Sequence, residues 1–185
     1  MIRFFGGRVM TLANGIETQD IEVWTEGSKI VFVGKPKAEE LDGKVFEREY
    51  DLKGNLLMPS FKNAHTHSAM TFLRSYADDM PLQDWLFKQI FPMEAKLDGE
   101  KVYWLTKLAI LEYLTTGCTA TFDMYFELDD YVKACIESGF RSVLCGAVSG
   151  DKSNLERLEN NYLKYNGKDP LISFMPVSYT HLRAH

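Results

Sequence analysis

The pattern of apolar and polar positions changes near residue 55. Before that point the apolar residues come in short β-branched or aromatic runs, among them "IEVWT" and "KIVFVG" on either side of "EGS". Such runs around a glycine-containing turn are typical of a β-hairpin. With "IRFFGGRVMTL" before them and "VFEREYDL" after them, they predict a small antiparallel β unit over residues 1–54.

After residue 55, short apolar runs alternate with longer segments of helical period. Strands are expected at "NLLMPSF", "CTATFDMYF", "RSVLCGAV" and "LISFMP". Helices are expected between them, the first interrupted by Pro92, at "PLQDWLFKQIFPMEAKL", "EKVYWLTKLAILEYLTTG", "DDYVKACIESG" and "SNLERLENNYLKYNG". This alternation predicts an α/β fold with a parallel sheet and right-handed crossovers. A doubly wound sheet and a (β/α)8 barrel both fit, although no G-x-G-x-x-G follows any strand.

Apolar residues at helical spacing predict which helix faces are buried. We expect glycines to end two of these helices, at Gly117 and Gly139. The predicted core positions on the last three helices are Trp104, Leu105, Leu108 and Leu111, then Val132, Cys135 and Ile136, then Leu155, Leu158 and Tyr162.

Composition and charge narrow the class of protein. The 185 residues are 45% hydrophobic and 25% charged, as in a globular protein, and the net charge of −5 offers no basic surface for nucleic acid. No long apolar run or signal-peptide pattern directs the chain to a membrane, so we expect a cytoplasmic protein. The three widely spaced cysteines (Cys118, Cys135 and Cys145) are predicted to be buried thiols rather than disulfides or metal ligands.

The segment "FKNAHTHSAM" carries candidate metal ligands, His65 and His67. Alternate residues of a strand point to the same face, so both imidazoles would enter one space at the carboxyl end of the first parallel strand. Imidazole nitrogen suits Zn²⁺ or Fe²⁺. A pair bonded only to backbone or water remains the alternative, because H-x-H alone is a weak motif.

The wider segment "GNLLMPSFKNAHTHSAMTFLRSYADDMPLQDWL" resembles the amidohydrolase superfamily. Within that superfamily, the segment resembles the branch of S-adenosylhomocysteine and 5′-methylthioadenosine deaminases and their chlorohydrolase-like relatives. The resemblance runs from residue 1 to about residue 176, with Ser60 where the family usually has glycine. It implies the first half of a metal-dependent (β/α)8 barrel over residues 55–176, preceded by part of a small composite β-sandwich domain over residues 1–54.

The resemblance also implies roles for particular residues. His65 and His67 resemble the first two ligands of one divalent metal ion, expected to be zinc, with iron as the alternative. Glu94 matches a glutamate that holds the nucleoside's ribose, although a solvated helix carboxylate is the simpler interpretation. Arg157 matches an arginine that some members direct at the substrate's tail, or is a solvated helix residue. Trp85 lines the pocket or packs in the core.

The implied activity is hydrolytic deamination of a small molecule, an adenine nucleoside such as S-adenosylhomocysteine, 5′-methylthioadenosine or adenosine. A second substrate-binding arginine of some relatives falls near Gly146, which argues against the homocysteine carboxylate. A chlorohydrolase or cyclic-amide hydrolase shares the H-x-H, and an inactive half-barrel fragment or a non-catalytic binding protein also fits. Cytidine-type zinc deaminases are excluded, since H-x-E…P-C-x-x-C is absent. The sequence does not decide whether the protein forms homo-oligomers.

The chemistry that the resemblance implies needs further groups. A third histidine and an aspartate complete the metal shell, and another histidine and a glutamate move protons; all are expected downstream, so no catalytic residue is predicted here. Residues 177–185, "VSYTHLRAH", match no barrel element and resemble translated adapter DNA. We therefore expect a native end near Pro176, with His181 and His185 not ligands. The competing interpretation is a helical metal pair at i and i+4.

Overall fold

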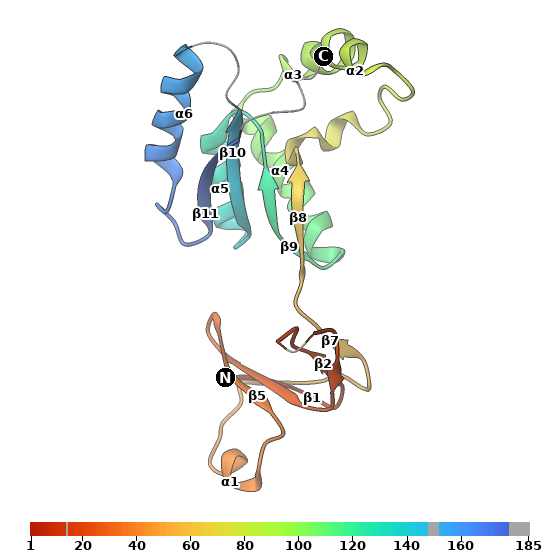
Figure 1. Cartoon of the computed structure of the whole chain (residues 1–185), viewed down its shortest axis with the longest axis vertical. Helices are drawn as coiled ribbons and strands as arrows, with labels where there is room; N and C mark the ends of the chain where they lie inside the picture. Colours follow the sequence, from red (N-terminus) through yellow and green to blue (C-terminus); the bar gives the residue numbers. More distant parts are fainter. Residues whose placement is uncertain (14, 148–151, 178–185) are drawn as a thin grey trace. The chain divides into compact units, whose positions relative to one another are not determined.

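The computed structural model describes residues 1–13, 15–147 and 152–177 (Figure 1). It divides into two compact units, Met1–Pro59 and Ser60–His185. Both are built around β-sheet, and the second adds helices, so the chain has the predicted mixed α/β fold.

The first unit contains two small sheets. One has the strand order β5-β4-β1-β6, and the other β3-β2-β7. The predicted hairpin is confirmed, because β4 and β5 pair antiparallel around Gly27, whose φ is +56°. The expectation of a wholly antiparallel unit is wrong, since β1–β6 and β2–β7 pair parallel across long connections. The elements are β1 (Ile2–Phe5), β2 (Arg8–Met10), β3 (Thr18–Gln19), β4 (Glu22–Glu26), β5 (Lys29–Gly34), α1 (Ala38–Leu41), β6 (Arg48–Asp51) and β7 (Leu56–Leu57).

A half-buried ion pair and a buried tryptophan stabilise the larger sheet of this unit. The Arg3 guanidinium donates to both carboxylate oxygens of Glu22 at 2.7 Å, from Nε and Nη2. It also lies 4.6 Å from the ring centroid of Phe5. Trp24 Nε1 donates to the same carboxylate at 2.9 Å, and the indole stacks on Phe32. Strands β1 and β4 are therefore tied together by side chains as well as by backbone.

The second unit is a four-stranded parallel sheet in the order β11-β10-β9-β8. The first three of these strands along the chain, β8, β9 and β10, are each followed by helix, as the alternating pattern predicted. The strands are β8 (Phe61–Thr66), β9 (Cys118–Asp123), β10 (Arg141–Ala147) and β11 (Ile172–Val177). The helical elements are η1 (Ser68–Leu73), α2 (Leu82–Asp84), η2 (Trp85–Ile90), α3 (Phe91–Glu94), α4 (Gly99–Thr115), α5 (Leu128–Glu137) and α6 (Lys152–Tyr165).

The first parallel strand begins later than the apolar run "NLLMPSF" predicted. Leu56 and Leu57 form β7 and pair with β2 in the first unit, whereas β8 starts at Phe61. Pro59 lies between them and cannot donate to a ladder, so the apolar run is split into two strands. The first compact unit accordingly ends at Pro59, and the second begins at Ser60.

The prediction that Pro92 interrupts the first helix is wrong. The chain stays helical from α2 through α3, with a π-helical stretch, η2, immediately before the proline. Pro92 lies in the first turn of α3, where a missing N–H is tolerated. The expected ends of α4 and α5 are confirmed, because Gly117 and Gly139 follow them with φ of +81° and +64°.

The helices bury different faces from those predicted. On α4, Trp104 and Leu111 are both 60% exposed, and the buried side chains are Val102, Thr106, Ala109 and Ile110. On α5, Cys135 is buried as predicted but Ile136 is exposed; on α6, Leu158 is buried but Leu155 and Tyr162 are exposed. These helices carry apolar residues on two adjoining faces, and periodicity alone does not select between them.

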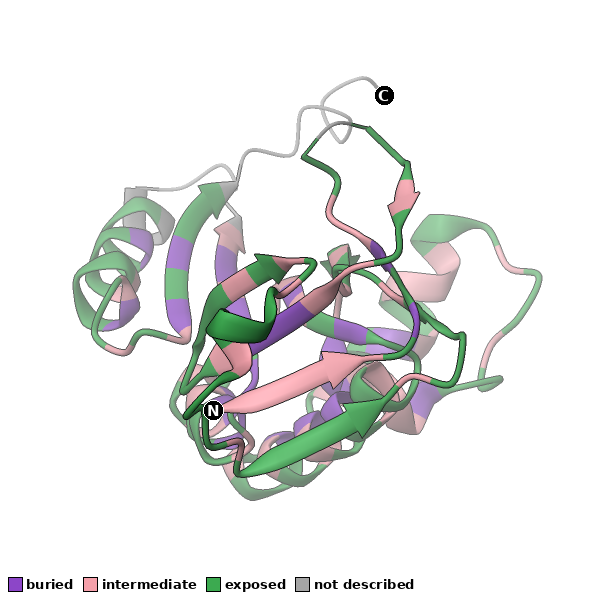
Figure 2. Ribbon diagram, turned by 90° about the horizontal axis from the view of Figure 1, so that it is seen from below, coloured by how far each residue is buried: buried purple, intermediate pink, exposed green. Residues whose placement is uncertain are grey.

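One hydrophobic cluster joins α4, α5 and α6 to the sheet. It includes Val102 and Ile110 of α4, Cys135 of α5, Leu158 of α6 and Phe174 of β11. Figure 2 shows these buried positions as bands along strands and helices. All three cysteines are buried free thiols, as predicted, and burial raises the pKa of Cys135 and Cys145 to about 12.

Candidate metal and substrate site

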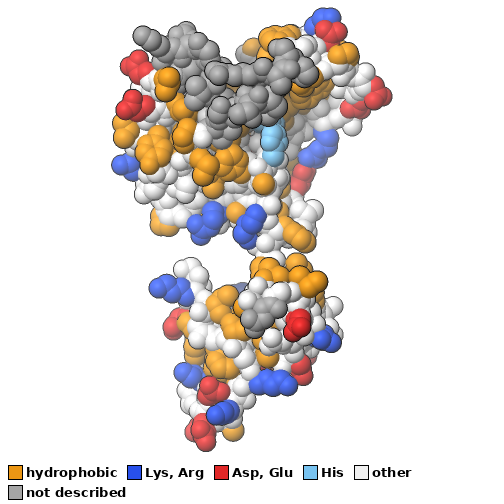
Figure 3. Space-filling model, in the orientation of Figure 1, with side chains coloured by type: hydrophobic (Ala, Val, Ile, Leu, Met, Phe, Trp, Pro, Cys, Tyr) orange, Lys and Arg blue, Asp and Glu red, His pale blue; other side chains and the backbone are white. Residues whose placement is uncertain are grey.

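The histidine pair lies at the carboxyl end of β8. His65 belongs to the strand, His67 follows it directly, and their ring centroids are 5.2 Å apart at an interplanar angle of 85°. Between them, the Thr66 hydroxyl bonds the Tyr113 hydroxyl of α4 at 2.6 Å. The two imidazoles therefore lie next to each other at this end of the strand. His65 is exposed and His67 half-buried, and Figure 3 shows histidine surface on the visible face of this unit.

The His67 ring is held by a backbone carbonyl. Its Nδ1 lies 2.7 Å from the carbonyl oxygen of Met124, the residue after β9. A carbonyl only accepts, so Nδ1 carries the proton and Nε2 keeps the lone pair. Metal-ligating histidines commonly have this arrangement, in which the second ring nitrogen is fixed by an acceptor.

A buried carboxylate that the sequence analysis did not single out lies next to this turn. Asp123, only 1% exposed at the end of β9, accepts from the backbone N–H of Ser68 and from the Ser68 hydroxyl. It also accepts from the Tyr131 hydroxyl of α5 at 2.7 Å. Burial raises its pKa, and the donors from Ser68 and Tyr131 counteract that rise. In the sequence, Asp123 could have been found as the one acidic residue inside the apolar run "CTATFDMYF".

Glu94 lies near the histidine pair at the end of α3. Its side chain is half-buried rather than solvated, and burial raises the pKa of its carboxyl. The nearby Tyr125 hydroxyl and His67 partly offset that rise. The Tyr125 hydroxyl is itself buried without a hydrogen-bond partner among the described residues. The structure therefore brings Glu94, Tyr125 and His67 within electrostatic reach of one another.

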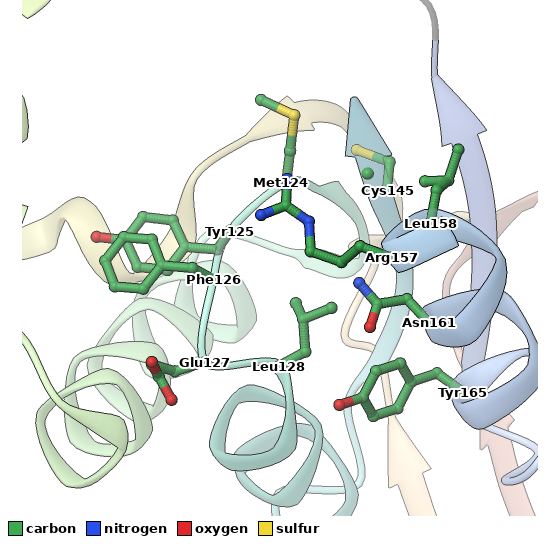
Figure 4. Close-up of a pocket in the computed structure, with 11 residues that line it drawn as sticks. Met124, Tyr125, Phe126, Glu127, Leu128, Cys145, Arg157, Leu158, Asn161 and Tyr165 are labelled. Carbon is green, nitrogen blue, oxygen red and sulfur yellow. The ribbon is translucent and has the colours of Figure 1, made fainter. Parts of the chain in front are cut away.

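Arg157 lines a separate cavity of about 370 Å³. In Figure 4 its side chain extends from α6 over the loop that follows β9. That loop also supplies Met124 and Tyr125, and the end of β10 supplies Cys145 and Gly146. Met124 thus connects the two regions, since its carbonyl holds His67 and its side chain lines the Arg157 cavity.

Gly146 is closed to larger residues. A Cβ at this position would lie 2.6 Å from Leu158 Cδ1 and 3.1 Å from Phe174 Cζ. A side chain at this position fits only if the packed Leu158 moves. Arg157 is the single arginine among the described residues that line this cavity.

Trp85 lies on another cavity, of about 260 Å³, which His67 and Tyr113 also line. It is half-buried. The structure therefore places Trp85 beside residues 66–68, here called the histidine turn, rather than beside Arg157.

Within residues 1–13, 15–147 and 152–177, no third His, Cys, Asp or Glu joins the histidine pair in a metal-binding group. His181 and His185, and the tail from residue 178 onward, lie outside the described residues, so both interpretations of that tail stay predictions. Among the helices that the structure describes, none has the length and apolar character needed to cross a membrane.

Comparison with known proteins identifies the family. The model of the Amidohydrolase family matches residues 56–169, more than half of the sequence. The chain belongs to the amidohydrolase family. This match includes the histidine turn, the Asp123 strand and the Arg157 helix.

Named relatives are deaminases. The chain is 43% identical over 136 residues to a 5-methylthioadenosine/S-adenosylhomocysteine deaminase of Desulfitobacterium hafniense, covering 74% of this amidohydrolase chain and 31% of the relative. It is 52% identical over 108 residues to a 5'-deoxyadenosine deaminase of Methanospirillum hungatei, covering 57% of this chain and 24% of the relative. The chain thus spans about a third or less of these relatives' length.

Solved structures agree in fold. An adenosine deaminase from Xanthomonas campestris with bound zinc superimposes with a TM-score of 0.83 at 30% identity, over 96% of this chain and 42% of that one. The zinc-bound atrazine chlorohydrolase TrzN from Arthrobacter aurescens superimposes with a TM-score of 0.78 at 19% identity, over 96% and 46%, and shows the fold alone.

Proposed function

We propose that this chain carries the first part of the active site of a metal-dependent aminohydrolase, with His65 and His67 as two ligands of one divalent ion, zinc in preference to iron. The observation that carries the proposal is the paired imidazoles at the end of β8, one of them fixed by the Met124 carbonyl. Their nitrogen donors suit zinc, and a zinc-bound deaminase shares this fold.

We further propose that the four-stranded sheet is half of a (β/α)8 barrel, and that the first unit is part of a composite β-sandwich domain. The buried residues of α4, α5 and α6 meet in one cluster, which supports helices on a single face of the sheet, whereas a doubly wound sheet carries them on both. The opposite face leaves Met175 52% exposed. In the full-length protein we expect further strands to close over that face.

The substrate that we propose is an adenine nucleoside with a short 5′ substituent, because the named relatives deaminate such compounds. Glu94, half-buried beside His67, would accept hydrogen bonds from the ribose hydroxyls. The cavity beyond it has one arginine, Arg157, and Gly146 has no room for a second. This single cation favours 5′-deoxyadenosine or 5′-methylthioadenosine over the charged tail of S-adenosylhomocysteine.

The chemistry divides between the ion and the protein. A bound divalent ion would polarise water and make it a nucleophile near neutral pH. His65 and His67 would hold the ion, with His67 kept in the Nδ1–H form by Met124. Glu94 and Arg157 would orient the nucleoside. The groups that move protons are expected beyond the described residues.

We also propose a cytoplasmic location. The three cysteines are buried free thiols, and thiols stay reduced in the cytosol.

Ammonia release by the full-length gene product tests the activity. We expect release from 5′-deoxyadenosine and 5′-methylthioadenosine, its loss after chelation, recovery with Zn²⁺, and no activity in His65→Ala. Chloride release from chlorinated triazines by the zinc-loaded protein, without ammonia from any nucleoside, would instead establish the chlorohydrolase alternative.

A further inference from the structure

Hydrogen bonds connect the end of β9 and the residue after it to each residue of the histidine turn, Thr66, His67 and Ser68. The Met124 backbone N–H donates to the Thr66 carbonyl at 3.2 Å, and the Met124 carbonyl accepts from His67 Nδ1 at 2.7 Å. Asp123 accepts from both the backbone and the hydroxyl of Ser68. Asp123, the last residue of β9, and Met124, which follows it, therefore bind three consecutive residues, Thr66, His67 and Ser68.

Two tyrosines anchor these contacts to the helices. Tyr131 of α5 donates to Asp123 at 2.7 Å and lies 3.0 Å from the Ser142 hydroxyl of β10. Tyr113 of α4 bonds the hydroxyls of Thr66 at 2.6 Å and Ser68 at 3.0 Å, the residues on either side of His67. The turn is thereby connected to two helices and two neighbouring strands.

Burying the Asp123 carboxylate costs free energy that an apolar side chain at the same position would not cost. Burying an ionised carboxylate is unfavourable unless donors compensate it, and an apolar residue of similar size would avoid the penalty. Among the described residues, the donors to the Asp123 carboxylate are Ser68 and Tyr131, so the compensation depends on the position of the turn that carries Ser68.

We propose that Asp123, acting through Ser68 and supported by Tyr131, is a positioning group that fixes the turn after β8 and holds His67 in the Nδ1–H form, with Nε2 directed away from Met124. The consequence for metal binding rests on the proposed function; the ring orientation does not. Groups that orient a ligating histidine typically contribute about 10- to 100-fold in metal affinity.

Histidine NMR of the 185-residue chain tests the orientation directly. We expect the ¹⁵N shifts of wild-type His67 to show the Nδ1–H form at a pH where the ring is neutral. Ser68→Ala and Asp123→Asn should bring His67 toward the mixed tautomers of a solvated ring. A wild-type His67 in the Nε2–H form, or with random-coil shifts, would overturn the proposal.

A matched control separates positioning from stability. Thr121 is a buried residue of the same strand whose hydroxyl bonds Ser142 at 3.1 Å, and in the described part of the chain it forms no hydrogen bond with the Asp123 carboxylate or with Ser68. Thr121→Val removes a buried hydroxyl, and Tyr131→Phe removes one donor to Asp123 while keeping the ring. We expect Thr121→Val to leave the His67 tautomer unchanged and Tyr131→Phe to shift it; an equal shift in both would reduce the network to ordinary packing and overturn the proposal.

Zn²⁺ titration followed at the His65 and His67 signals adds a second measurement. Ser68→Ala should weaken binding about tenfold, and Thr121→Val by less than about twofold. Unchanged affinity in folded Ser68→Ala and Asp123→Asn would count against the proposal. If the chain shows the Nδ1–H form yet the full-length wild type binds no zinc, the positioning stands and the proposed metal function fails.

Discussion

At the scale of single residues, the site depends on which groups are oriented and which are merely nearby. His67 is oriented, because Met124 fixes one ring nitrogen. Glu94 is placed by α3 at the same end of the sheet, half-buried and close to His67. Burial of this kind commonly marks a carboxylate that meets a ligand rather than bulk solvent.

Replacing Glu94 tests its proposed contact with the nucleoside. In the full-length protein, Glu94→Gln should raise the dissociation constant for 5′-methylthioadenosine about tenfold or more, because a charged acceptor to hydroxyl donors is lost. Zinc content should not change. Glu100→Gln on the exposed first turn of α4 is the control, and equal affinity in wild type and Glu94→Gln would exclude the ribose role.

The Arg3–Glu22 pair predicts a pH dependence of stability in the first unit. Hydrogen bonds from Arg3 hold the pKa of Glu22 below its ordinary value. A carboxyl with a depressed folded-state pKa stabilises the fold above its unfolded pKa of about 4.3, and this contribution is lost as pH falls through the folded value.

Glu22→Gln should therefore lower the free energy of unfolding by about 1–3 kcal/mol at pH 7, and the difference from wild type should shrink below about pH 4. Urea unfolding of the 185-residue chain followed by tryptophan fluorescence measures it. Glu49→Gln, which removes the more exposed partner of Arg3, should cost less. A wild-type-to-variant gap that is constant from pH 7 to pH 3 would contradict the assignment.

At the scale of elements, the sequence predicted which segments form the parallel strands, but it did not predict which face of each helix is buried. Alternation of apolar runs with helical segments is a local property, and it correctly indicated β8 to β11 as a parallel sheet. The buried face of α4 depends on what packs against it, and Ile110 and Leu111 look equally apolar in the sequence. The pairing of β7 with β2 joins segments far apart in the chain, and only tertiary structure reveals it.

The same distinction applies to the candidate site. The orientation of His65 and His67 followed from strand alternation and their surroundings. Asp123 was missed because its partners, Ser68 and Tyr131, come from other elements. The closure of Gly146 was likewise invisible, since Leu158 and Phe174 close it from α6 and β11.

Two neighbouring residues of α4 test the observed core face. Ile110 is 3% exposed and Leu111 is 60% exposed. Ile110→Ala should lower the free energy of unfolding by about 2–5 kcal/mol, whereas Leu111→Ala should change it by less than about 1 kcal/mol. Chemical denaturation of the two variants decides the matter, and the reverse order of cost would restore the face predicted from periodicity.

At the scale of the whole molecule, we propose that the chain supplies part of a metal site. Two imidazoles fall short of the three protein ligands that a catalytic zinc usually takes, and the described residues provide no third. The matched relatives are about three times as long or longer. We expect the remaining ligands and the proton-transfer groups to come from the rest of the full-length protein.

The central claim is that His65 and His67 bind one metal ion together. Anomalous diffraction at the zinc edge from crystals of the full-length protein tests it most directly. The account predicts a single zinc peak about 2.0–2.1 Å from a ring nitrogen of each histidine, Nε2 in the case of His67. A fully occupied zinc bound elsewhere, with both imidazoles outside its coordination shell, would contradict it.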